Sequence, residues 1–269
     1  MNVIKMLSET YEEVGVVGAN QLLLKHRQEN RLYMAKKFSL EWDLDLAPLI
    51  DRNVVQMKEK FHESEELTLI LELCEFGDMD RQIAEKATIP EYAATHILAQ
   101  CCQGLLFFAD AYKVIKPANV FVNKLGEVKV GDFAFSREKA GAYNSPELVA
   151  RKPVDGKSNV WSLGATIYHL VDMKVPFPDE YCIAHREPST PSTPTSQEFL
   201  TLMMVMLQKE AAFRPSAEEI LSTELIKSLT LSCPHKNEVL CTEADDEAKE
   251  FEPEITSPSF TEWLPLQID

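Results

Sequence analysis

The chain has 269 residues, of which 45% are hydrophobic and 26% are charged, and its formal net charge is −16. This length and composition suit a globular protein with one large domain or two modest ones. The acidic balance argues against nucleic acid and anionic membranes as partners, because both select basic surfaces. Half of the net charge lies in residues 241–269, which hold nine acids and one lysine.

The first third of the chain predicts a small β-rich lobe. Between the third and fourth predicted strands, residues 39–50 place Leu44, Ala47 and Ile50 at helical spacing. The polar stretch 62–66 predicts a turn between the last two strands. The five predicted strands cover residues 13–18, 20–26, 31–38, 53–61 and 67–74.

From Pro90 onward the pattern becomes helical. Residues 90–112 repeat apolar side chains every three or four positions, which predicts a buried amphipathic helix. Residues 158–173 are apolar nearly all round, which predicts a central helix, and 196–207 and 216–223 predict two more. Three prolines among Ser and Thr at 186–196 predict a surface loop.

The two ends of the chain predict no membrane or secretion signal. The N-terminus has no long apolar core, and no apolar run approaches the roughly 18–20 residues that a membrane span needs. The scattered cysteines are expected to be free thiols, so the expected location is cytoplasmic or nuclear. Residues 1–10 are expected to be an N-terminal extension, and the acidic, proline-broken residues 233–269 a disordered tail.

Seven short motifs occur in a characteristic order between residues 33 and 221. They are YMAKKF (33–38), LILELCEFGDM (69–79), KPANVFV (116–122), VKVGDFAFSR (128–137), NSPEL (144–148), NVWSLGATIYHL (159–170) and FRPSAEEIL (213–221). In this order they resemble a eukaryotic-type protein kinase over about residues 11–230. The sequences of the motifs are most similar to those of the NIMA-related serine/threonine kinases. The resemblance implies an α+β, bilobal kinase fold, with a small β-rich N-lobe at 11–74 and a larger helical C-lobe at 75–232.

The same resemblance implies a set of nucleotide-binding residues. Lys37 is the phosphate-binding lysine, Leu71 is the gatekeeper, and Glu72 and Cys74 line the adenine pocket. Asn119 and Asp132 are the metal ligands, with the oxygen donors that Mg²⁺ prefers. Asp43 takes the place of the glutamate that pairs with the lysine, Glu41 is the alternative, and both acids also suit a solvated helix start. ATP and Mg²⁺ are therefore the implied cofactors, although the altered motifs leave their binding open.

The glycine-rich loop that should cradle the phosphates is degraded to Gly15 and Gly18. Counting back from Lys37 puts Gly15 first, with Val17 and Asn20 at the other glycine positions. Counting from Tyr11 instead puts Gly18 first and Asn20 second. In either alignment at most two glycines remain, and the alternative is a plain β-hairpin with no phosphate role.

The catalytic loop lacks its base, because the motif H-R-D-L-K-x-x-N requires an aspartate two residues before the lysine. An ungapped alignment puts Val114 there; a second, which we favour, treats residues 113–115 as a strand and removes the motif. Neither supplies a group that accepts a proton. Asp110 is the nearest upstream acid but belongs to the helix end. Lys116 matches the catalytic-loop lysine, and its role without the aspartate is open.

Further changes fall in the loops that do chemistry, whereas residues of the scaffold remain. Alanine replaces the glycine of D-F-G at Ala134, and Asn159 stands where the family has an aspartate. Glu147 and Arg214, by contrast, match a buried ion pair. The sequence therefore predicts a pseudokinase, a kinase-shaped regulatory or scaffolding protein with unidentified protein partners. The alternatives are a weakly active or unconventional serine/threonine kinase and an aberrant, non-functional kinase-derived chain.

Overall fold

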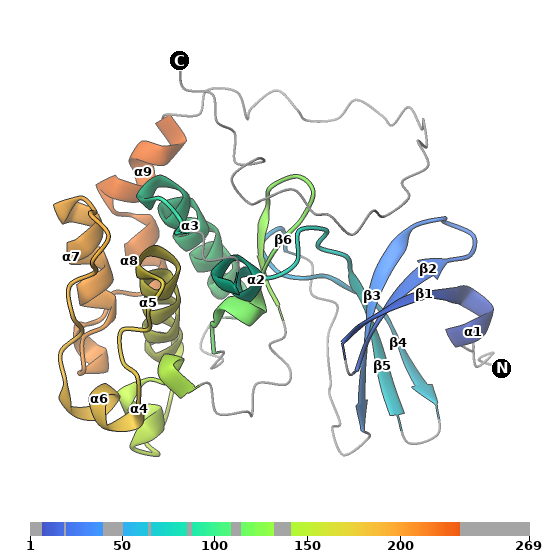
Figure 1. Cartoon of the computed structure of the whole chain (residues 1–269), viewed down its shortest axis with the longest axis horizontal. Coiled ribbons are helices and arrows are strands. Elements are labelled where there is room, and N and C mark those ends of the chain that lie inside the picture. Colours follow the sequence, from blue (N-terminus) through green and yellow to red (C-terminus); the bar gives the residue numbers. More distant parts are fainter. Residues whose placement is uncertain are drawn as a thin grey trace.

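The computed structural model describes residues 7–18, 20–39, 51–63, 66–84, 88–108, 114–131 and 141–231. Within them a β-sheet forms one lobe and a set of helices forms the other (Figure 1). The predicted α+β, two-lobed arrangement is therefore confirmed. The predicted helix at 39–50 and the tail at 233–269 fall outside the described residues, apart from Ser39.

The sheet of the first lobe is antiparallel, in the order β1-β2-β3-β5-β4. All five strands occur where the sequence predicts them, except that β4 begins four residues later than expected. Helix α1 (Leu7–Thr10) precedes the sheet. The strands are β1 (Tyr11–Gly18), β2 (Gln21–His26), β3 (Leu32–Ser39), β4 (Met57–Glu63) and β5 (Glu66–Glu72).

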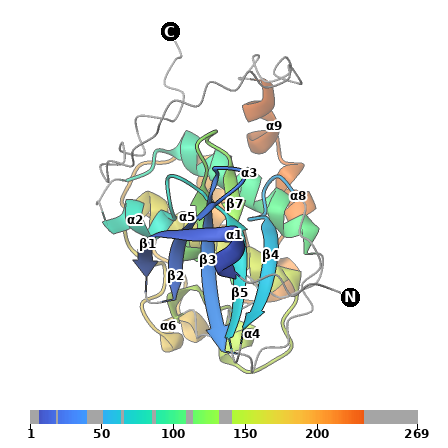
Figure 2. The same ribbon diagram turned by 90° about the vertical axis from the view of Figure 1, so that its right-hand side faces the viewer.

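One face of this sheet has its own hydrophobic core. Leu7 of α1 packs against this cluster, which therefore lies on the face that α1 covers. In Figure 2 helix α1 lies in front of β3 and β5, while the helical lobe lies behind the sheet. The opposite face is consequently turned toward the helical lobe. The clustered residues are Tyr11, Leu24, Tyr33, Ala35, Phe61 and Ile70.

Helix α5 (Gly156–Asp172) is the centre of the second lobe, as its apolar sequence predicts. It contacts α3 (Glu91–Phe107) and α7 (Gln197–Met206), and Trp161 and Tyr168 are almost fully buried. The remaining elements are α2 (Met79–Ala84), η1 (Pro117–Asn119), η3 (Gly141–Tyr143), α4 (Pro146–Val149), α6 (Glu180–His185), η4 (Ala211–Phe213), α8 (Ala217–Leu221) and α9 (Glu224–Leu231).

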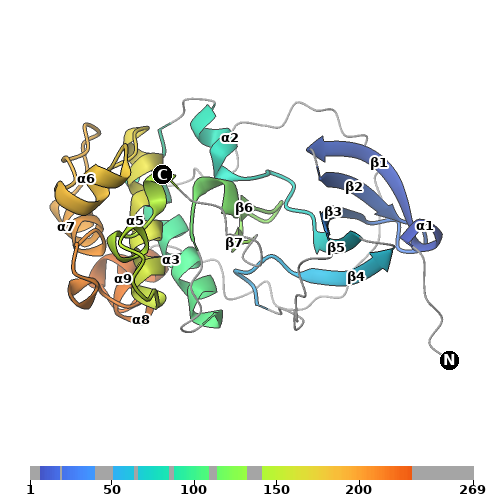
Figure 3. The same ribbon diagram turned by 90° about the horizontal axis from the view of Figure 1, so that it is seen from below.

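A two-stranded sheet of β6 (Val120–Val122) and β7 (Val128–Val130) lies between the lobes (Figure 3). The segment before β4 runs along β7, because Val54 pairs with Val130 and the Val130 amide donates to Asn53 at 2.8 Å. The lobes are therefore joined both by the chain after β5 and by this segment. None of the described helices has the length and apolar character that crossing a bilayer requires.

Candidate functional site

The chain passes from β5 into the helical lobe through Glu72 to Cys74, where the resemblance places the adenine pocket. Glu72 is fixed by a buried ion pair, with its Oε1 3.0 Å from Nζ of Lys129, whose side chain is only 4% exposed. Lys129 also donates to the Arg52 carbonyl at 2.9 Å. The Glu72 carboxylate therefore stabilises the junction of the lobes. In the backbone that would meet an adenine, the Glu72 amide donates to the Gln56 carbonyl at 2.9 Å and the Cys74 carbonyl accepts from the Gly77 amide at 3.0 Å.

Cys74 is buried beside this ion pair. Burial, and to a smaller extent the charge of Glu72, raise the pKa of its thiol to about 12. The thiol therefore stays neutral and acts as part of the wall. The described cysteines, Cys74, Cys101, Cys102 and Cys182, are all free thiols.

The register of β3 against β5 separates two adjacent lysines onto opposite faces of the sheet. Lys36 is opposite Leu69 and shares its face with Met34 and Leu71. Lys37 is opposite Thr68 and shares its face with the cluster under α1. The resemblance assigned Leu71, as gatekeeper, and Lys37, as phosphate-binding lysine, to one pocket. The two side chains therefore lie on different faces of the sheet instead.

Lys37 has a partner on its own face of the sheet. Its Nζ lies 3.4 Å from Oε2 of Glu66, and the two side chains are 38% and 59% exposed. Such a solvated pair contributes little to stability. Asp43 and Glu41, the acids suggested as its partners, lie outside the described residues.

Lys36 is the residue that the sequence analysis missed. It is half-buried on the face turned toward the helical lobe, and its ammonium lies 5.6 Å from the ring of Phe38 on that face. A signal was present in the sequence, since only every second residue of a strand shares the face of Leu71. The sequence does not give the pairing register of β3 with β5, however, so it could not show which residues of β3 share the face of Leu71.

The degraded glycine loop forms a β-hairpin of β1 and β2, whose pairing register shifts between Glu13 and Gly15 and again between Val16 and Gly18. Gly15 lies opposite Leu23 and Gly18 opposite Gln21. Neither glycine has a positive φ, and a Cβ at Gly15 would meet no atom within 4 Å. The side chains of Val16 and Val17 are 71% and 55% exposed. These glycines are therefore not required by their conformation or by close packing, which favours the plain-hairpin interpretation.

Asn119 presents an oxygen that suits a cation. Its side chain is 1% exposed, its Nδ2 donates to the Val114 carbonyl at 3.3 Å, and its buried Oδ1 has no hydrogen-bond donor among the residues that the structure describes. Leaving such an oxygen unpaired is costly unless a ligand satisfies it, and amide oxygens are ligands for Mg²⁺. Gly131, which precedes Asp132, donates to the Asn119 carbonyl at 2.9 Å. Asp132 itself lies outside the described residues.

In the segment before Asn119, the position of the catalytic-loop aspartate, two residues before Lys116, is occupied by the aliphatic Val114. Val114 is 1% exposed, so its side chain belongs to the interior. Val114 and Ile115 lie in no strand, so the strand predicted for 113–115 is wrong for these two residues. Lys116 is half-buried and precedes η1. The suggested substitute base Asp110 falls outside the described residues.

Helix α5 holds this segment through two hydroxyls. The Ile115 amide donates to Oγ of Ser162 at 2.9 Å, and Oγ1 of Thr166 donates to the Ile115 carbonyl at 3.0 Å. Ser162 in turn donates to the Asn159 carbonyl. Asn159 replaces the aspartate of the family, yet α5 still anchors the loop through these two hydroxyls. The signal was Ser162 and Thr166, four residues apart in an apolar helix.

Glu147 and Arg214 form the predicted buried ion pair. Two bonds join them, Nη1 to Oε1 at 2.7 Å and Nη2 to Oε2 at 2.8 Å, and the Arg214 side chain has no exposed surface. Burial alone would raise the pKa of Glu147, but hydrogen bonds from Arg214 and Ser158 outweigh it and hold that pKa below its ordinary value. Arg214 also donates to the carbonyls of 157, 208 and 209. Its guanidinium therefore joins Glu147 to the segments around 157 and 208–209.

Comparisons with known proteins agree with this geometry. A family model described as the protein kinase domain matches residues 25–226. The chain is 29% identical to the serine/threonine-protein kinase Nek4 of Mus musculus over 76% of this chain and 30% of that protein. It is 32% identical to Nek1 of Mus musculus (60% and 14%) and 29% identical to human Nek5 (66% and 28%).

These relatives are NIMA-related kinases, in line with the resemblance of the motifs. The chain spans less than a third of the length of each of them. It is also 25% identical to the serine/threonine-protein kinase polo of Drosophila melanogaster, over 79% of this chain and 39% of that protein. The two lobes, the ion pair of Glu147 with Arg214 and the matched residues together place this chain in the protein kinase domain family.

Proposed function

We propose that the protein is a pseudokinase, a kinase-shaped regulatory or scaffolding protein with little or no phosphotransfer. The observation that carries the proposal is Val114, a buried aliphatic residue two positions before Lys116. A valine neither accepts the proton of a hydroxyl nor orients it, and general-base action typically contributes about 10²–10⁴ in rate. The intact ion pair of Glu147 with Arg214 supports a fold that is retained for binding.

The residues that would hold ATP with Mg²⁺ are partly retained. Asn119 offers a buried amide oxygen to the metal, and the backbone of 72–74 offers a hinge to the adenine. We propose that Lys36, on the face shared with Leu71, meets the phosphates in place of Lys37. When bound, Mg²⁺ neutralises phosphate charge. The β1–β2 hairpin does not supply a glycine-rich loop whose amides would surround the phosphates. We therefore expect weak nucleotide binding without turnover.

The partners that we propose are proteins, in the cytoplasm or the nucleus. The net charge of −16 supports proteins over nucleic acid and anionic membrane surfaces.

The test is incubation of the full chain with Mg²⁺, labelled ATP and a generic protein acceptor, with Lys36→Met and Lys37→Met in parallel. We expect no incorporation above that of the variants. Incorporation that disappears in Lys36→Met would overturn the proposal, because it would require turnover in the cleft.

The second candidate is a weakly active serine/threonine kinase. The unpartnered Oδ1 of Asn119 favours it, because positioning and electrostatics supply much of phosphoryl transfer. The same assay separates it from the first candidate. A third candidate, an aberrant kinase-derived chain, would be favoured by failure of the purified chain to unfold cooperatively.

A further inference from the structure

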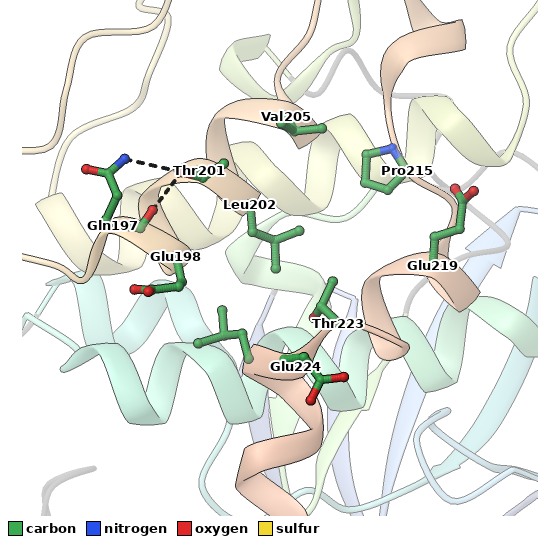
Figure 4. A pocket seen from close by; sticks show the side chains of 10 residues that line it. Gln197, Glu198, Thr201, Leu202, Val205, Pro215, Glu219, Thr223 and Glu224 are labelled. Atoms are coloured by element: carbon green, nitrogen blue, oxygen red, sulfur yellow. Dashed lines mark hydrogen bonds between the residues drawn. The ribbon is translucent and has the colours of Figure 1, made fainter.

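A groove lies in the helical lobe, between α7 and the pair α8–α9 (Figure 4). In Figure 1 these helices lie on the side of the helical lobe away from the β-sheet lobe. Its volume is about 610 Å³, which is within the roughly 300–1,000 Å³ of ligand pockets. Its floor is apolar and half-buried, and Leu202 points into the space between the helices in Figure 4. The floor residues are Leu202, Val205, Pro215 and Leu225.

Three glutamates form the rim of the groove: Glu198 from α7, Glu219 from α8 and Glu224 from α9. All three are exposed, and the side chains of Glu219 and Glu224 are 68% and 91% exposed. None of the residues that line the groove carries a positive charge. Lys227 lies 3.1 Å from Glu224 in an exposed pair, and such pairs are weak and easily exchanged. Lys157 lies 3.7 Å from Oε2 of Glu219, but its side chain is only 31% exposed and its Nζ donates to the Arg214 carbonyl at 2.6 Å. The same Glu219 oxygen accepts from the Ser216 amide at 2.6 Å, so Glu219 is the most engaged of the three glutamates.

We propose that this groove docks a segment of a partner protein that combines apolar anchors with flanking lysines or arginines. Apolar side chains would fill the floor, and the cations would meet the three rim glutamates, as in the docking of amphipathic segments into grooves. A groove with an apolar floor and a rim of one sign is complementary to that chemistry.

The charge of the groove also decides between this occupant and two others. The chain's own residues 241–269 hold nine acids and one lysine, so the tail has the same sign as the rim. A second copy carries a net charge of −16 and is repelled likewise. A cationic segment from another protein is the occupant that charge favours.

The inference deepens the proposed scaffolding role by naming the chemistry of one partner, and it rests on that role. It makes no use of Lys36, Asn119 or Val114. Binding at the groove is therefore measured without nucleotide, and its failure leaves the phosphotransfer result unchanged.

The probe is a fluorescein-labelled amphipathic peptide built only of Leu and Lys, titrated with the full chain and followed by fluorescence anisotropy. A peptide in which Glu replaces each Lys is the control for the probe. Glu198→Lys with Glu224→Lys reverses two rim charges, and Glu12→Lys with Glu13→Lys makes the same charge change on exposed positions of β1. Thr201→Trp fills the groove from an exposed position on α7 without removing a floor residue.

We expect binding to weaken about tenfold in the rim pair, because two attractive charges at the rim become repulsive toward the cationic peptide. It should weaken as much or more in Thr201→Trp and change little in the β1 pair. Added salt should weaken binding as well.

Equal losses in the rim pair and the β1 pair, or unchanged binding in Thr201→Trp, would overturn the proposal, because the peptide would then follow the overall charge. Equal binding of the Glu peptide would do the same. Tighter binding in Trp263→Ser would assign the groove to the chain's own tail. If sedimentation showed a dimer that Thr201→Trp dissociates, the groove would be assigned to a second copy of this chain. Both this result and tighter binding in Trp263→Ser would contradict the docking of a partner-protein segment.

Discussion

At the scale of single residues, Val114 and Asn119 have opposite consequences for the loop before β6. They are joined by one hydrogen bond, from Nδ2 of Asn119 to the Val114 carbonyl. Asn119 retains a buried oxygen that suits a metal ion, whereas the buried side chain of Val114 has no acid–base chemistry. We therefore propose that Asn119 is retained for a nucleotide complex, while the described residues 114–119 include no carboxylate that could activate an acceptor hydroxyl.

Nucleotide binding should depend on Lys36 and not on Lys37. We expect saturating ATP with Mg²⁺ to raise the melting temperature of the full chain by mass action. Lys36→Met should abolish most of that shift, because Lys36 shares the face of Leu71, while Lys37→Met should retain it. Thermal-shift titrations of the three proteins measure this. The reverse order of the two variants would refute the assignment, and the absence of a shift in all three would refute nucleotide binding.

The ion pair of Glu147 with Arg214 should control stability in a pH-dependent way. Glu147→Gln leaves a buried guanidinium without its counter-ion, so we expect a loss of about 3–5 kcal/mol at pH 7. The pKa of Glu147 is lowered in the folded state. Its contribution is therefore present above the unfolded-state pKa, near 4.5, and is lost as the pH falls through the folded-state value.

Urea denaturation at pH 7 and pH 4 measures this difference. Glu224→Gln is the matched control, because its pair with Lys227 is 91% exposed on the glutamate side and should give no measurable change. A Glu147→Gln chain as stable as the parent at pH 7 would show that the pair is not needed for the scaffold.

How far single residues could be predicted depended on whether a motif fixes them without tertiary information. Glu147 and Arg214 were identified correctly, because both occur in motifs with fixed spacing. The choice between Lys36 and Lys37 could not be made, because it depends on the pairing register of β3 and β5. The hydroxyls of Ser162 and Thr166 were missed for a related reason, since their partner Ile115 is 47 and 51 residues away.

At the scale of elements, helix α3 and the segment before β4 are packed closely enough to require a glycine. A Cβ at Gly104 would lie 2.5 Å from the Asn53 carbonyl oxygen and 3.1 Å from Cγ2 of Val130. Asn53 is itself held by β7, since its Nδ2 donates to the Val128 carbonyl at 2.8 Å. The contact of α3 with the segment before β4 therefore leaves no room for a methyl group at this position.

Gly104→Ala should destabilise the protein by about 1–3 kcal/mol, the usual cost of overpacking. Gly15→Ala is the control, because a Cβ there meets no atom within 4 Å and alanine costs less backbone entropy than glycine. It should be neutral or slightly stabilising. Thermal unfolding of both variants measures the difference, and equal melting temperatures would contradict the close contact.

The elements predicted from periodicity were those with long apolar repeats or alternating strands. The strands and helices α3, α5 and α7 were anticipated, because each satisfies a hydrophobic period over several turns or residues. Helix α8 has only five residues and was anticipated within the motif FRPSAEEIL. The short helices α2, α4 and α6 were not, since one or two turns give too few repeats to detect. Helix α9 was missed although it lies beside the groove.

At the scale of the whole molecule, the fold could be predicted from the sequence, whereas the groove of the helical lobe could not. The two-lobed architecture was predictable, because seven motifs in order identify it and residues 25–226 match the family model. The groove of α7 to α9 was not predictable, because its floor and rim come from three helices and from Pro215 before α8, which the sequence does not place together. We therefore propose that the helical lobe is a binding scaffold in addition to a support for the candidate nucleotide site.

The most direct measurement of the central claim is phosphotransfer by the full chain with Mg²⁺ and labelled ATP, beside Lys36→Met and Lys37→Met. The account predicts incorporation no greater than that of either variant, because Val114 supplies no base. Incorporation well above both that is lost in Lys36→Met alone would contradict it and identify the protein as an active kinase.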